Sequence, residues 1–156
     1  MKICSDKFMY FLLLLVSFVS APAITQERPN IILILADDLG YSDLGAFGGE
    51  IHTPNLDAIA KQGIQLTNFH TGPTCGPTRA MLMTGIDHHR AGMGSNSAAL
   101  RRLTELQGQP GYEGYLNNRV VTFASLLQDS GYHTFMTGKW DLGKQQGQLP
   151  TDRGFD

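Results

Sequence analysis

The chain has 156 residues, of which 42% are hydrophobic and 17% are charged, and its formal net charge at pH 7 is −2. A hydrophobic fraction of this size suits one globular core. The small negative charge and the lack of any run rich in Lys and Arg argue against nucleic acid as a partner.

The first residues have the pattern of a secretory signal. Lys2 and Lys7 flank the start of an apolar run over residues 8–19, and the small residues at 21–23 resemble a cleavage site. The apolar run is too short to span a bilayer comfortably. We therefore expect residues 1–23 to be cleaved and the product to be secreted or periplasmic, with no stable membrane partner. An uncleaved anchor is the alternative.

Cleavage would leave a single cysteine. Cys4 precedes the apolar run and leaves with the signal, whereas Cys75 remains in residues 24–156, which we expect to form one domain. A lone thiol in an exported protein has no partner for an internal disulfide. It is then either a small buried side chain or a group with a chemical role.

After the signal, apolar patterning predicts strands that alternate with helices. The expected elements are a strand over 30–36, a helix from Pro54 to Gly63 capped by Thr53, a strand over 64–70, a helix beginning near Pro77, a helix from Thr122 to Gly131, and a strand over 132–137. This alternation predicts an α/β fold with a parallel sheet. Between Ile86 and Asn118 the chain is rich in glycine, with at most a short helix over 100–106, and we expect a functional loop or an insertion there.

Polar side chains follow each predicted strand. Asp37 and Asp38 follow the first, the segment from Cys75 to Arg79 follows the second, and Lys139 follows the third. Ligands of open α/β sheets bind beyond the carboxyl ends of the strands, so these groups are expected to meet at one edge. Adjacent carboxylates there need a neutralising partner, and their oxygens suit Ca²⁺ or Mg²⁺. The alternative is that one aspartate caps a helix and the other is a solvated turn residue.

The residues around Cys75 favour a chemical role for the thiol. An anion held at the start of the predicted helix would meet free backbone N–H groups and the positive end of the helix dipole. Arg79 offers a planar fork for a tetrahedral oxyanion, and Lys139 adds a second positive charge. A hard cation, a cationic cradle and a nucleophile together indicate hydrolysis of a sulfate or phosphate ester.

The segment Cys75-Gly76-Pro77-Thr78-Arg79, followed by Thr84-Gly85, resembles the Cys-x-Pro-x-Arg signature of type I sulfatases. Other segments resemble successive blocks of that family in the family's order: 29–30, 36–40, 53–57, 68–71, 138–140 and 153–155. Segments 45–49 and 84–89 look closest to bacterial arylsulfatases. The resemblance implies the N-terminal part of an alkaline phosphatase-like α/β/α sandwich with a mainly parallel sheet.

The resemblance also implies the roles of individual residues. Asp37, Asp38 and Cys75 would be metal ligands for Ca²⁺, with Mg²⁺ as an alternative. A formylglycine-generating enzyme would convert Cys75 to formylglycine (3-oxoalanine), whose gem-diol is the nucleophile on sulfur. Arg79 would hold the diol and Lys139 would bind an oxygen of the sulfate ester, which is a small molecule or a glycan.

The sequence departs from the family pattern in two places. Asp141 stands where the family normally has a histidine that holds the sulfate, and a carboxylate there would repel the substrate. The family's later metal ligands, its general-acid histidine and a further lysine would lie beyond Asp156. We therefore expect the chain as given to lack a complete active site.

Two other functions stay open at this stage. A phosphonate or phosphate monoester hydrolase of the same superfamily would use similar chemistry, and a secreted non-catalytic remnant would keep Cys75 as a thiol. His88 and His89 are interpreted as a loop pair whose side chains point apart, rather than as a metal site.

Overall fold

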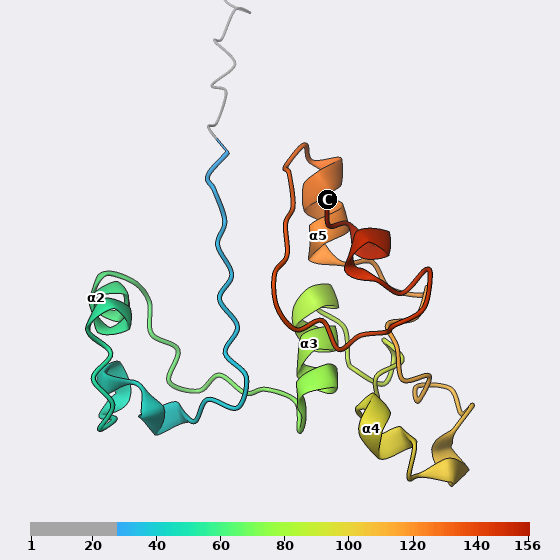
Figure 1. Cartoon of the computed structure of the whole chain (residues 1–156). Coiled ribbons are helices and arrows are strands. Elements are labelled where there is room, and N and C mark those ends of the chain that lie inside the picture. The colour runs from blue at the N-terminus through green and yellow to red at the C-terminus, as the bar shows by residue number, and fades with distance from the viewer. Residues whose placement is uncertain (1–27) are drawn as a thin grey trace, which may run out of the picture. The chain divides into compact units, whose positions relative to one another are not determined.

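The computed structural model describes residues 28–156 (Figure 1). The chain divides into two units, and the boundary in the sequence lies between Ala36 and Asp37. The signal expected over residues 1–23, and Cys4 with it, lies outside the described residues. Within residues 28–156, no helix combines the length and the apolar character that crossing a membrane requires.

The described part of the first unit, residues 28–36, forms no strand. Its apolar side chains are exposed, with 83% of Ile32 and 76% of Ile34 accessible to solvent. The prediction of a strand over 30–36 is therefore wrong for this structure. A strand exists only when its backbone groups pair with a neighbouring strand, and apolar residues alone do not supply that neighbour.

The strands predicted over 64–70 and 132–137 are also absent, since residues 28–156 contain no strand at all. Ile64 and Phe135 are 90% and 77% exposed, so neither segment is covered as a strand in a sheet would be. At Thr134, the carbonyl accepts a hydrogen bond from the Asp156 N–H at 2.7 Å and the N–H donates to the Asp156 carboxylate at 2.8 Å. The expected parallel sheet is thus replaced by irregular segments, and the regular structure of the described residues is helical.

The second unit begins with two 3₁₀ helices, η1 (Tyr41–Asp43) and η2 (Gly45–Phe47), followed by helix α2 (Pro54–Gln62). Helix α2 confirms the prediction from Pro54 and Gly63, which stand at its first turn and its end. Thr53 does not cap α2 with its side chain. Its hydroxyl instead accepts a hydrogen bond from the Gly45 N–H at 2.9 Å and donates to Asp57 at 2.8 Å, which ties η2 to α2.

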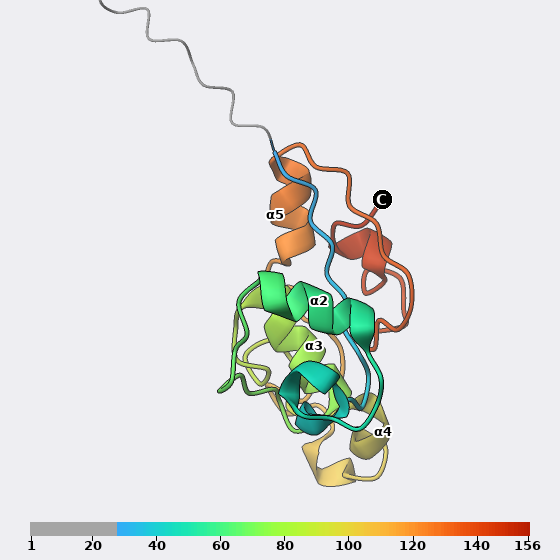
Figure 2. The ribbon, with the colours of Figure 1, turned by 90° about the vertical axis from the view of Figure 1, so that its left-hand side faces the viewer.

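Helices α3 (Cys75–Thr84) and α5 (Phe123–Asp129) pack against each other and lie next to each other in both ribbon views (Figures 1 and 2). Helix α5 begins as expected, because the Thr122 hydroxyl accepts a hydrogen bond from the Ser125 N–H at 3.1 Å. The buried hydrophobic cluster comprises Ala80, Met83, Ala91, Met93, Leu116, Ala124 and Leu142. It holds α3, and with it Cys75, against the segments that follow.

The glycine-rich stretch from Ile86 to Asn118 contains the short helix α4 (Ser97–Leu100) and the 3₁₀ helix η3 (Thr104–Leu106). It is fixed from the C-terminal end of the chain, where the last 3₁₀ helix, η4 (Pro150–Arg153), carries the buried side chain of Arg153. The Arg153 guanidinium donates to the Leu116 carbonyl at 2.6 Å and to Asn118 at 2.8 Å. A charge-assisted bond of this kind is among the stronger hydrogen bonds in proteins, so this long stretch is anchored rather than loose.

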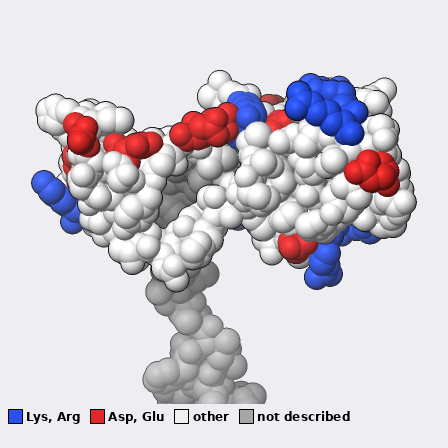
Figure 3. Space-filling model, turned by 90° about the horizontal axis from the view of Figure 1, so that it is seen from below, with Lys and Arg blue, Asp and Glu red and all other residues white. Residues whose placement is uncertain are grey.

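Charged side chains of both signs are spread over the surface. On the face drawn in Figure 3, the Lys and Arg side chains are scattered among acidic and uncharged ones and form no continuous stripe.

Candidate active site around Cys75

Three of the predicted site residues meet in the second unit although they are far apart in the sequence. The Lys139 ammonium donates a hydrogen bond to Oδ2 of Asp37 at 2.9 Å, across 102 positions of the chain. Nη2 of Arg79 lies 3.8 Å from Oδ1 of the same carboxylate. Asp37 therefore stands between two cations, which is the neutralisation that its position after an apolar segment requires.

Arg79 is also bonded to the backbone beside Lys139. Its Nη1 donates to the Lys139 carbonyl, and its side chain is only 11% exposed, whereas those of Asp37 and Lys139 are about half exposed. The backbone bond joins the first turns of α3 to the segment at Lys139. Arg79 thus contributes position as well as charge, and the sequence offered no signal for this bond.

Cys75 is the first residue of helix α3, two positions earlier than predicted. Pro77 has no N–H group and is fully buried, so the first turn offers only the N–H groups of Cys75 and Gly76 to an anion. Thr78 holds the entry to the helix, because its hydroxyl donates to the Gly72 carbonyl at 3.2 Å. The Cys75 side chain is partly accessible, as a reacting group must be.

The electrostatics of this cluster keep both members of the Lys139–Asp37 pair charged. The hydrogen bond from Lys139 lowers the pKa of Asp37 below its usual value, and the nearby positive charges act in the same direction. The pKa of Lys139 is raised, first by its hydrogen bond to Asp37 and then by its interaction with the Cys75 side chain. Lys139 therefore stays an ammonium at neutral pH, bonded to the Asp37 carboxylate.

Two other predicted site residues share an unusual backbone conformation. Asp38 and Asp141, with φ of 60° and 57°, are the non-glycine residues with positive φ among residues 28–156. This left-handed conformation is uncommon for residues with a side chain, aspartate adopts it more readily than most, and it gathers at functional sites. Asp38 is exposed and forms no ion pair within residues 28–156.

Asp141 lies beside the residue that follows Cys75. A Cβ atom built on Gly76 would stand 3.6 Å from Oδ2 of Asp141 and 2.6 Å from Cε of Met93. Within residues 28–156, Asp141 forms no ion pair with Lys139 or Lys144, and Lys139 pairs with Asp37 instead. The Asp141 carboxylate is thus close to the cluster without being neutralised by either lysine.

Two of the three predicted metal ligands have donor atoms that suit a hard cation. Asp37 and Asp38 supply the carboxylate oxygens that Ca²⁺ prefers. Cys75 offers a soft sulfur that suits Ca²⁺ poorly, whereas a formylglycine hydrate at this position would offer oxygens instead. By their chemistry the two aspartates suit the cation and Cys75 suits it only after conversion, but both oxygens of Asp37 lie against Lys139 and Arg79, so Asp37 must exchange these partners to bind a metal ion.

The prediction that His88 and His89 point apart is wrong. The two rings lie 4.3 Å apart between centroids with an angle of 36° between their planes, because the residues occupy a turn and not a strand. Asp87 lies beside them. The adjacency of these three residues in the sequence is the signal for this cluster, and the rule that neighbouring side chains point apart holds for a strand but not for a turn.

Comparison with known proteins identifies the family of this chain. The family model described as Sulfatase matches residues 29–156. The chain therefore belongs to the sulfatase family, as the Cys-x-Pro-x-Arg segment predicted.

Individual relatives agree with this assignment. The chain is 52% identical to an uncharacterised sulfatase of Schizosaccharomyces pombe over 83% of its own length and 24% of that protein. It is 48% identical to an arylsulfatase of Klebsiella aerogenes, covering 87% of the chain and 28% of the relative. The solved structure of Ps i-CgsB in complex with k-i-k-neocarrahexaose is similar with a TM-score of 0.60 and 34% identity, over 83% of this chain and 27% of that one. The chain thus spans about a quarter of the length of the relatives that it matches.

Proposed function

We propose that this chain carries the nucleophile and the first substrate contacts of an arylsulfatase-type sulfuric ester hydrolase. One observation carries the proposal: Asp37 is bonded to Lys139 and paired with Arg79, which stands four residues after Cys75 on α3 and donates to the Lys139 carbonyl. A carboxylate, two cations and a partly accessible cysteine are thereby gathered from three separate segments. In a chain of the sulfatase family, this group lies where the chemistry is expected.

Cys75 would act after its conversion to formylglycine by a formylglycine-generating enzyme. The hydrated aldehyde supplies two hydroxyl groups on one carbon, so that one can attack sulfur and the other can later expel sulfate. Asp37 and Asp38 would hold Ca²⁺, or alternatively Mg²⁺, which supplies charge stabilisation to the ester oxygens.

Arg79 and Lys139 would stabilise negative charge on either side of Cys75. Arg79 is mostly buried and fixed by its backbone bond, so its charge is already in place before the substrate arrives. Lys139 is more exposed and can exchange its bond with Asp37 for one with a sulfate oxygen. A cation fixed in advance and one that can change its partner suit an anionic sulfate ester better than two mobile cations would.

Asp141 would weaken the binding of an anionic substrate at this site rather than bind sulfate. Its carboxylate lies near Gly76 with no lysine paired to it, so it would repel an anionic substrate. The family's histidine at this position can adopt positive φ almost as readily as aspartate can, so backbone geometry does not explain the exchange.

The proposed substrate is a sulfate ester of an aryl compound, a small molecule or a glycan. The names of two relatives support these classes, an arylsulfatase and a protein whose structure holds k-i-k-neocarrahexaose. Residues 1–23 would direct the protein to the periplasm or the exterior.

A phosphonate or phosphate monoester hydrolase is the competing function, because both tetrahedral esters suit the same cations. The test uses a chimera in which this chain replaces the matching 28% of the Klebsiella aerogenes arylsulfatase, since the chain alone spans only about a quarter of its relatives. We expect the chimera to hydrolyse an aryl sulfate with a kcat/KM at least about tenfold above that for the matching aryl phosphate. The intact Klebsiella enzyme is the control. A preference for the phosphate would contradict the sulfatase proposal.

A further inference from the structure

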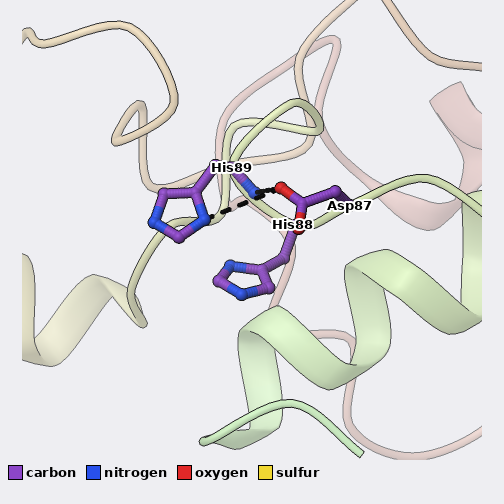
Figure 4. Close-up of side chains that lie close together, drawn as sticks. All are labelled: Asp87, His88 and His89. Atoms are coloured by element: carbon purple, nitrogen blue, oxygen red, sulfur yellow. Dashed lines mark hydrogen bonds and ion pairs between the residues drawn. The ribbon is translucent and has the colours of Figure 1, made fainter.

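The turn that follows helix α3 brings together three side chains of metal-binding type. Asp87, His88 and His89 each offer one ligand atom, and these atoms all lie within 4.8 Å of one another (Figure 4). Asp87 and His89 are exposed and His88 is partly buried. The group lies beyond the C-terminal end of α3, whereas Cys75 lies at its start, so it shares no residue with the proposed sulfate site.

The tautomer of the neutral His88 ring is set by a backbone neighbour. Its Nδ1 lies 3.1 Å from the Met93 carbonyl oxygen. A carbonyl can only accept, so Nδ1 carries the hydrogen and Nε2 keeps a free lone pair. A histidine that donates one ring N–H to a backbone carbonyl is oriented as metal-bound histidines usually are.

Both ring nitrogens of His89 also lie near polar groups. Its Nε2 lies 3.1 Å from the hydroxyl oxygen of Tyr112, and its Nδ1 lies 3.6 Å from Oδ1 of Asp87. If Nε2 donates to Tyr112, then Nδ1 turns its lone pair toward the carboxylate. The same Oδ1 accepts the His89 backbone N–H at 3.0 Å, and its remaining lone pairs and the lone pair of Nδ1 could bind one cation placed between them.

The backbone holds this turn in place. The Met93 N–H donates to the His88 carbonyl at 2.7 Å, and the Gly94 N–H donates to the Gly111 carbonyl at 2.7 Å, which brings the segment of Tyr112 against the turn. Met93 is fully buried. A Cβ atom on Gly94 would stand 2.7 Å from both the His89 and the Tyr112 rings, so glycine is needed for this approach.

Solvent and ions can reach the group. His89 lines an open cavity of about 460 Å³. Arg90 and Arg119 also line this cavity, and the charge of Arg119 is balanced by Glu113, with an N···O distance of 2.6 Å.

We propose that Asp87, His88 and His89 bind one divalent cation of the zinc class, with water at the remaining position. Two imidazole nitrogens and one carboxylate oxygen are ligands typical of Zn²⁺. Tetrahedral binding requires ligand atoms about 3.3 Å apart, so the group must contract, which the exposed Asp87 side chain can do by rotating toward the two rings. The ion would join the turn after α3 to the segment of Tyr112.

The first test titrates the full chain with Zn²⁺ by calorimetry, with excess Ca²⁺ present to occupy the carboxylates of Asp37 and Asp38. We expect one ion to bind with a Kd below about 100 μM. His88→Ala and His89→Ala should each weaken binding at least tenfold, and Tyr112→Phe should weaken it by about 10–100-fold through the lost hydrogen bond. His52→Ala, at an exposed histidine outside the group, is the matched control.

A second measurement needs no variant. In the NMR spectrum of the unmodified chain, Zn²⁺ should shift the ring signals of His88 and His89 and leave those of His52 and His133 in place. Co²⁺ in place of Zn²⁺ should give an absorption spectrum without the sulfur band that binding to Cys75 would produce. Absence of binding, a sulfur band, equal effects of His52→Ala, or unshifted ring signals of His88 and His89 would each overturn the proposal.

Discussion

Replacing Cys75 with alanine should abolish hydrolysis of an aryl sulfate by the chimera. The alanine removes the atom from which the formylglycine hydrate is made, and loss of a nucleophile commonly lowers kcat by more than about 10⁴. Steady-state kinetics with the same aryl sulfate measure the effect. Helix α3 should persist, because its first turn is held by Thr78 and the buried Pro77 and does not depend on the thiol.

A second variant, Cys75→Ser, separates attack on sulfur from release of sulfate. Serine has one hydroxyl group, so it can accept the sulfuryl group but has no second hydroxyl with which to expel it. We expect at most one equivalent of product and then no further turnover. Steady turnover by Cys75→Ala within tenfold of the parent chimera would show that Cys75 is not the nucleophile.

Replacing Lys139 with alanine should lower kcat/KM for the aryl sulfate by about 100–1,000-fold. Lys139 is the cation that bonds to Asp37 beside the proposed nucleophile, and removal of one positive charge at a reacting oxyanion typically has an effect of this size. The Asp37 carboxylate would also lose the hydrogen bond that lowers its pKa, so its pKa should rise toward the ordinary value. Kinetics and carbon-detected NMR titration of the Asp37 carboxylate measure the two effects separately.

Lys144→Ala is the matched control for this variant. Lys144 is an exposed lysine five positions further on, and it forms no ion pair within residues 28–156. Its replacement should leave kcat/KM unchanged within about twofold. Equal losses for Lys139→Ala and Lys144→Ala would mean that Lys139 acts only through the overall charge.

The helices could be predicted from the sequence because their signals are local. Pro54 and Gly63 bracket α2, and Thr122 caps α5 within one turn of its own position. Whether an apolar segment forms a strand could not be predicted in the same way, because strand pairing depends on a distant partner. The apolar run over 30–36 is exposed in the described structure. Apolar composition marked this segment for burial but did not determine what would bury it.

The members of the candidate site were predictable, but their contacts were not. The Cys-x-Pro-x-Arg motif contains Cys75 and Arg79, and the need to bind an anionic ester pointed to Lys139 as a second cation. The bond from Arg79 to the Lys139 carbonyl spans 60 positions and involves a backbone atom, which no residue type indicates. The positive φ of Asp38 and Asp141 was likewise invisible, because aspartate adopts many other conformations.

The most direct test of the central claim is the chemical state of Cys75. The chain is produced together with a formylglycine-generating enzyme and cleaved with trypsin, and the mass of the peptide covering residues 62–79 is measured. The sulfatase account predicts that this peptide loses one sulfur and two hydrogen atoms and gains one oxygen, and that it reacts with an aldehyde reagent. The same peptide from cells without that enzyme should keep its thiol. An unmodified thiol in both preparations would contradict the account.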